Sequence, residues 1–159
     1  MAEGLAGINL GNTADWGLFG IVPRITGTVG FQGLIETKGI PPKPGEPRPA
    51  YHALRLVVEK LDGFSRVKTL NLPRGIHAYQ FTVNSRSVYV VWYDDGQRYL
   101  PGQDEPRTRL RTPLPPGPYQ VTETPIRSGP TPTRQITVGR SGWECELGIT
   151  PIFVEPERR

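Results

Sequence analysis

Few residues in this chain combine the types and spacing that enzyme chemistry requires. The two histidines, His52 and His77, are far apart in the sequence, and Cys145 is the only cysteine. No Gly-x-Ser-x-Gly pattern and no Cys–His pair accompanies them, so neither a nucleophilic triad nor a zinc site is predicted. No glycine-rich loop that would hold a phosphate follows a predicted strand. The sequence therefore predicts no metal ligand and no cofactor.

The acidic residues also lack an arrangement that points to catalysis. Asp15 adjoins Trp16, Glu36 and Glu46 lie in a predicted loop, and the other carboxylates fall mainly on predicted surface turns. No two of them form a visible pair of the kind that acid–base catalysis uses. A carboxylate in such a loop is more often solvated than catalytic. No catalytic residue is assigned.

Residues 48–62 form the one convincing helix in the sequence. Pro49 suits the first turn of a helix, and Gly63 ends it. The opposite faces differ in polarity, and we expect the apolar one to be buried. The residues of that apolar face are Ala50, Tyr51, Leu54, Val57, Val58 and Leu61. His52 lies on the other face, so we expect it to be solvated rather than catalytic.

After Ser65 the hydrophobic period changes from that of a helix to that of a strand. The predicted strands are 66–72, 76–84, 87–93, 119–124, 134–138, 143–147 and 149–155. Residues 96–116 read as a long loop, and residues 39–49, which hold five prolines, read as an extended arm. The predicted fold is mainly β: an antiparallel β-sandwich of about seven to eight strands, preceded by a partial β/α unit with one clear helix at 48–62.

Composition agrees with this fold class. The 159 residues include 19 glycines and 18 prolines, which shorten every potential helix. Hydrophobic residues make up 36% of the chain and charged residues 21%, too apolar for wholesale disorder and too polar for a membrane protein. Cys145 has no disulfide partner in the chain and is expected to be a buried small hydrophobe.

The net charge of +4 does not indicate a nucleic-acid partner. Arg107, Arg109 and Arg111 cluster in the predicted proline-bracketed loop, with acidic neighbours, and no basic stripe with interleaved aromatics occurs. We interpret the charge as a solvated surface. At the N-terminus there is no basic region, and glycines interrupt the apolar stretch, so neither a signal peptide nor a transmembrane segment is expected, and the cellular compartment is left open.

The order of the motifs along the chain resembles the C-terminal part of clan A glycoside hydrolases with a β/α barrel, in particular xylosidase-like retaining families. The motifs that carry this resemblance are Trp16-Gly17-Leu18-Phe19, Gly33-Leu34-Ile35, Pro47-Arg48-Pro49-Ala50-Tyr51-His52-Ala53-Leu54, Pro73-Arg74-Gly75, Val88-Tyr89-Val90-Val91-Trp92 and Thr150-Pro151-Ile152-Phe153-Val154-Glu155. The resemblance implies the last strand and helix of a barrel over residues 1–63 and a β-sandwich domain over residues 64–159. These motifs are structural ones.

The resemblance implies that the two catalytic glutamates of such enzymes lie on earlier barrel strands, outside this sequence. It also implies that Trp16 forms a wall of the sugar site, because sugar C–H bonds stack on an aromatic face. Asn12 and Asp15 would then hydrogen-bond sugar hydroxyls. The alternatives are that Trp16 is a core aromatic and that Asn12 and Asp15 form turns. Trp92 and Trp143 have aliphatic neighbours and are assigned to the sandwich core.

Two kinds of function fit these observations, and a third, a complete small enzyme of unknown type, ranks last because no group of residues supports it. The first is a non-catalytic C-terminal portion or subunit of a glycoside hydrolase, whose partner is the missing barrel portion or another copy of the chain, because a single β/α unit leaves strand edges unpaired. The second is a stand-alone carbohydrate-binding or protein-interaction module, for which we expect an exposed row of aromatics such as Tyr93 with Tyr99. Carbohydrate is a candidate ligand in both.

Overall fold

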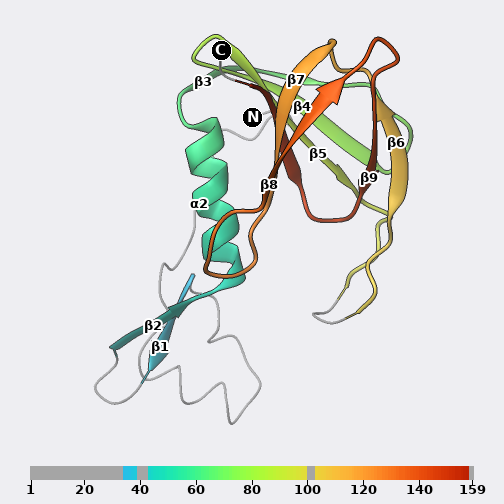
Figure 1. The fold of residues 1–159 in the computed structure, drawn as a ribbon. Coiled ribbons are helices and arrows are strands. Elements are labelled where there is room, and N and C mark those ends of the chain that lie inside the picture. Colours follow the sequence, from blue (N-terminus) through green and yellow to red (C-terminus); the bar gives the residue numbers. More distant parts are fainter. Residues whose placement is uncertain (1–33, 39–42, 100–102, 158–159) are drawn as a thin grey trace. The chain divides into compact units, whose positions relative to one another are not determined.

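The computed structural model describes residues 34–38, 43–99 and 103–157. Within these ranges the chain is mainly β, with antiparallel sheets and one helix, as the sequence predicts (Figure 1). The elements are β1 (Ile35–Lys38), β2 (Lys43–Pro47), α2 (Pro49–Leu61), β3 (Phe64–Thr69), β4 (Ile76–Val83), β5 (Arg86–Tyr93), β6 (Thr108–Thr112), β7 (Gly117–Glu123), β8 (Thr133–Val138), β9 (Trp143–Leu147) and β10 (Ile152–Pro156).

These residues fall into two compact units, which we describe separately. The first comprises residues 59–99, 103–124 and 131–157, with the last turn of α2 and all strands from β3 to β10. The second comprises residues 34–38, 43–58 and 125–130. In the second unit β1 pairs with β2 in an antiparallel hairpin, and the backbone N–H of Arg48 donates to the carbonyl of Leu34 over 2.8 Å. Part of the predicted proline arm is therefore a short strand.

The larger sheet of the first unit has six strands in the order β3-β4-β5-β10-β7-β8, all antiparallel. The β4–β5 hairpin closes through Asn84 and Ser85, whose φ angles are 49° and 64°. Two successive residues with positive φ make the tight turn whose twist matches that of the strands. The last strand, β10, lies in the middle of the sheet, where Phe153 is opposite Val90 on one side and Thr122 on the other.

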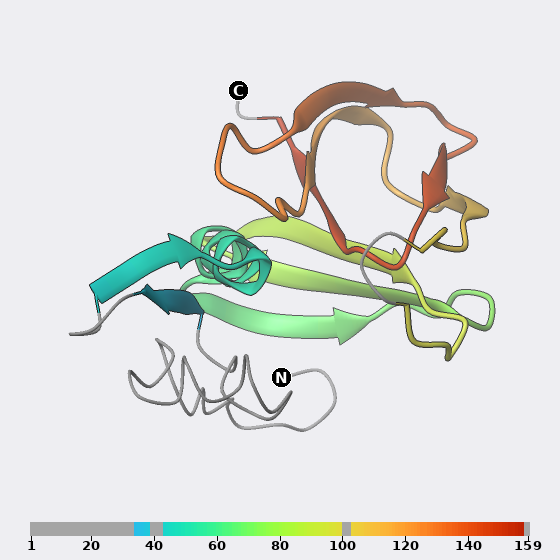
Figure 2. The same ribbon diagram turned by 90° about the horizontal axis from the view of Figure 1, so that it is seen from below.

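The core lies between this sheet and the two-stranded sheet of β6 and β9. In Figure 2, β3, β4 and β5 of the six-stranded sheet form one layer. The strands β7 and β8 of the same sheet lie on one side of that layer, together with β6 and β9 of the two-stranded sheet. Alternate residues of both sheets point into this space. The buried residues of the core are Ala78, Tyr89, Val91, Leu110, Leu114, Tyr119, Val121, Val138, Trp143, Cys145, Leu147 and Val154.

The strand β6 falls within a segment that the sequence pattern assigns to a loop. Leu110 and Thr112 point inward and are buried, whereas Arg109 and Arg111 are exposed. Each of these arginines is paired in register with a glutamate of β9, Glu146 and Glu144 respectively. The Arg111 guanidinium lies 3.7 Å from the Glu144 carboxylate. Arg109 and Arg111 are therefore part of a strand with acidic cross-strand neighbours, whereas Arg107 precedes that strand.

Helix α2 begins at Pro49, as expected, but the prediction of its buried face was wrong. The buried side chains are His52 and Leu56, 4% and 2% exposed, while Val57 and Val58 are 40% and 56% exposed. His52 is therefore not solvated: its Nε2 lies 3.5 Å from Ser128 Oγ, and its ring and that of Tyr51 are nearly perpendicular, with centroids 5.4 Å apart. The sequence alone could not show which of two arcs of the helix would be covered.

Candidate functional site

The residues singled out from the sequence divide between described and undescribed parts of the chain. Trp16, Asn12 and Asp15 lie outside the described residues. Trp143 is 9% exposed within the core, as predicted. Trp92 was predicted to share that core, but it alternates with Tyr89 and Val91 of β5 and lies on the opposite face of the six-stranded sheet.

That opposite face carries a row of aromatic rings at its β3–β4–β5 side. The rings of His77 and Trp92 stack with centroids 4.9 Å apart and planes 10° apart. Tyr79 stacks on the same indole at 5.5 Å and 26°. Phe64 and Phe81 extend the row as an edge-to-face pair. We call these five residues the ring row. The pair expected from the sequence, Tyr93 with Tyr99, does not belong to it.

The β10–β7–β8 side of the same face is polar and hollowed. A groove of about 400 Å³ lies between the last turn of α2 and these strands. The residues that line it are Glu59, Lys60, Gln120, Thr122, Thr131, Thr133, Glu155, Pro156 and Glu157. Because Gln120 pairs in register with Glu155, and Thr122 with Thr133, these side chains project from the same face of the sheet. We call this the acidic groove.

An ion pair between residues far apart in the sequence lies in the acidic groove. Lys60 Nζ donates to Glu155 Oε1 over 3.0 Å, and each side chain is only 13% exposed. Breaking a pair at this depth leaves one charge without its partner, which is costly. The pair connects α2 to the central strand β10.

Thr122 has an unusual environment in the acidic groove. Its side chain is 1% exposed, and its Oγ1 has no hydrogen-bond partner. A buried hydroxyl without a partner costs about 1–3 kcal/mol relative to one that is hydrogen-bonded. Such a group indicates a site that a water molecule or a ligand completes.

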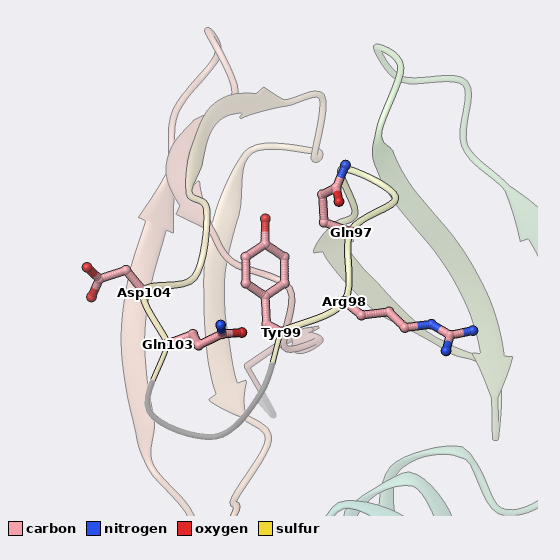
Figure 3. Close-up of a pocket in the computed structure, with 5 residues that line it drawn as sticks. All are labelled: Gln97, Arg98, Tyr99, Gln103 and Asp104. Carbon is pink, nitrogen blue, oxygen red and sulfur yellow. The ribbon is translucent and has the colours of Figure 1, made fainter.

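A second hollow, of about 620 Å³, lies in the loop after β5 and is shown in Figure 3. In that view Gln103 lies beside the ring of Tyr99, whereas Arg98 and Asp104 point to opposite sides. The Tyr99 hydroxyl donates to the Asp95 carboxylate. This hydrogen bond raises the pKa of Tyr99 to about 12 and, with the Gln97 backbone N–H, holds the pKa of Asp95 below its usual range. Asp95 is therefore ionised at neutral pH and is not a general acid.

Neither a metal centre nor a reactive thiol is evident in the described part of the chain. No group of three or more histidine, cysteine or acidic side chains able to hold a metal ion occurs there. Burial raises the pKa of Cys145 to about 11, so its thiol is protonated and unreactive at neutral pH. No helix among the described residues is long and apolar enough to span a membrane.

Sequence reasoning did not find the acidic groove or the ring row. Lys60 and Glu155 are 95 residues apart, so only the sheet topology brings them together. The structure shows that Val121 and Thr122 are adjacent in a strand and both buried, as in a sheet covered on both faces, but their burial could not be read from the sequence. Comparison of the chain with protein-family models, with curated proteins and with solved structures finds no match.

Proposed function

We propose that this chain is the non-catalytic C-terminal portion or subunit of a β/α-barrel glycoside hydrolase. The observation that carries the proposal is the environment of α2. In a barrel enzyme the last helix packs against neighbouring barrel elements, so its apolar face is covered by residues that precede it in the chain.

The exposed arc of α2 fits this role. Ala50, Val57 and Val58 are exposed, and Leu54 and Leu61 are only partly buried, although these five residues form the most apolar arc of the helix. A soluble protein rarely leaves such an arc uncovered unless something packs on it. The side chains that are buried instead, His52 and Leu56, lie on a different arc.

The proposed role is structural. The sandwich braces the barrel and shapes the edge of its cleft, and Trp16 supplies one wall of the sugar site when the rest of the barrel is present, with Asn12 and Asp15 as hydrogen-bonding neighbours. The catalytic acid/base and nucleophile come from the missing strands. Under this proposal the chain alone does not hydrolyse glycosides.

The proposal can be tested on the purified chain by measuring its molecular mass, its folding and its activity on a panel of chromogenic glycosides. We expect a folded protein without activity. We also expect that Val57→Lys combined with Val58→Lys lowers both the binding of a hydrophobic dye and any self-association, because it removes the exposed apolar arc. The same double change at Val67 and Thr69 of β3 serves as a control.

Two results would overturn the proposal. One is reproducible hydrolysis that a single carboxylate substitution abolishes, which would place a catalytic pair within the chain. The other is dye binding and self-association unchanged in the Val57→Lys, Val58→Lys protein, which would mean that the arc is not an unsatisfied packing surface.

The second candidate function is a carbohydrate-binding or protein-interaction module, and the ring row favours it. The stacked rings of Trp92 and His77 are partly exposed and offer an aromatic surface of the kind on which sugar C–H bonds pack, whereas Tyr79 beside them is buried. Affinity electrophoresis in gels containing plant polysaccharides distinguishes the two functions. Retardation of the chain that Trp92→Ala removes and Tyr99→Ala leaves intact supports the module, whereas no retardation in any gel counts against it.

A further inference from the structure

The acidic groove has the chemistry of a binding site for a cation. Its lining includes three carboxylates, Glu59, Glu155 and Glu157, against one ammonium group, that of Lys60. This is a local excess of negative charge on a chain whose net charge is +4. The carboxylates of Glu59 and Glu157 are on exposed side chains at the rim, while Glu155 lies deeper.

The groove is also rich in hydrogen-bond acceptors. Carboxylates accept only, and threonine hydroxyls accept as well as donate. The one ammonium donor, Lys60, already donates to Glu155. A ligand that brings N–H donors and a positive charge complements this lining.

Thr122 provides an independent indication of a ligand. It projects from the same sheet face as Gln120 and Glu155, lines the groove, and keeps its hydroxyl oxygen buried without a partner. An acidic cluster by itself is usually a solvated surface, but a buried and unpartnered hydroxyl beside it marks a place where a hydrogen-bond partner is missing. The volume of about 400 Å³ suits a small ligand or one long side chain.

We propose that the acidic groove binds the ammonium or guanidinium group of a cationic ligand, with Thr122 Oγ1 and Glu155 accepting its N–H groups and with Glu59 and Glu157 attracting it at the rim. The cation is either a free small amine or a basic side chain of a protein partner. This inference uses residues that the proposed function does not, and it stands or falls independently of that function.

The test is a titration of the full chain with agmatine, which carries both an ammonium and a guanidinium group, followed by NMR of the backbone amides. We expect saturable shifts at Gln120, Thr122 and Glu155, weakened by added salt. The neutral polyol erythritol, at the same concentration, should leave these amides unshifted. Absence of saturation with agmatine, or equal shifts with erythritol, would overturn the proposal.

Three variants locate the site. Glu157→Gln should weaken agmatine binding about threefold, as expected for one exposed charge. Thr122→Val should weaken it about fivefold, because an accepted hydrogen bond from a cation is lost. Glu123→Gln makes the same charge change on the other face of β7, outside the groove, and should leave the affinity unchanged. An equal loss of agmatine affinity in Glu157→Gln and Glu123→Gln would mean that agmatine is attracted by the general charge of the surface, and would contradict the proposal.

Folding and binding can be separated in the Thr122→Val protein. Removing a buried unpaired hydroxyl should raise the melting temperature of the protein while it lowers its affinity for agmatine, so weaker binding cannot be attributed to unfolding.

A peptide with two arginines distinguishes the two sources of the cation. Affinity about tenfold above that of agmatine indicates a side chain of a protein partner, and equal or lower affinity indicates a free amine.

Discussion

Cys145 is a thiol held within the sandwich core, 6% exposed, and its ionisation should link folding to alkaline pH. Burial raises its pKa from 9.0 to about 11. Because the folded state holds this proton more tightly than the unfolded state, the stabilisation is complete below pH 9 and is lost as pH rises from 9 to 11. The loss amounts to about 2 kcal/mol for a shift of this size.

Urea denaturation of the wild type and of Cys145→Ala at pH 8.5 and pH 10.5 measures this linkage. The wild type should lose about 2 kcal/mol more than the variant over that interval. Burial also raises the pKa of Tyr119, but this effect is present in both proteins and cancels in the difference. Identical pH dependence of the two proteins would contradict the prediction.

For single residues, the sequence predicted burial correctly where it follows from the alternation of polar and apolar residues along one strand. Trp143 and Cys145 alternate with glutamates in a short strand, and both are in the core. Trp92 has aliphatic neighbours on one side, like a core residue, yet it belongs to a strand in which both faces are apolar. Thr122 could not be recognised as unpaired, because its partners would have to come from other elements.

At the scale of elements, α2 has one buried arc, which includes Leu56, and one exposed arc, which includes Val58. Leu56 is 2% exposed and Val58 is 56% exposed. Leu56→Ala should therefore lower the free energy of unfolding by about 3 kcal/mol, through lost burial and the cavity left behind. Val58→Ala should change it by less than about 0.5 kcal/mol, because its side chain is already in water and alanine favours the helix.

Chemical denaturation of the two helix variants distinguishes the observed buried face from the one that the hydrophobic pattern predicts. If Val58→Ala proved as destabilising as Leu56→Ala, the predicted face would be the covered one in solution. If a larger protein contains this chain and its barrel covers the exposed arc, as proposed, Val58→Ala should be strongly destabilising in that protein, because Val58 would then be buried.

The strands were more predictable than the helix face. The bounds of β9 follow directly from the alternation in Trp143–Leu147, whereas the predicted strand 76–84 extends one residue into the turn that Asn84 and Ser85 form. The strand β6 was missed because Thr108–Thr112 has one strongly apolar residue, Leu110, between two arginines. Those arginines stabilise a strand only when glutamates of β9 lie opposite.

For the whole molecule we predict that the segment before Ser65 is less stable than residues 65–156, or depends on a partner. The reason is that a barrel remnant, as proposed for this segment, would lack the rest of its barrel in the isolated chain, whereas the sandwich has a continuous core drawn from two sheets. Native-state hydrogen exchange should show stronger protection in β4, β5, β7 and β10 than in α2. Equally strong protection in both regions of the monomer would disprove the prediction.

The central position of β10 in the six-stranded sheet has a consequence for folding during synthesis on the ribosome. The strands β3, β4 and β5 form one hydrogen-bonded block and β7 with β8 another, and within the six-stranded sheet β10 is the strand that joins them. Until Pro156 has left the ribosome exit tunnel, both blocks therefore present an open strand edge to other nascent chains. A chaperone that shields β5 and β7 during this interval would improve the yield of folded protein.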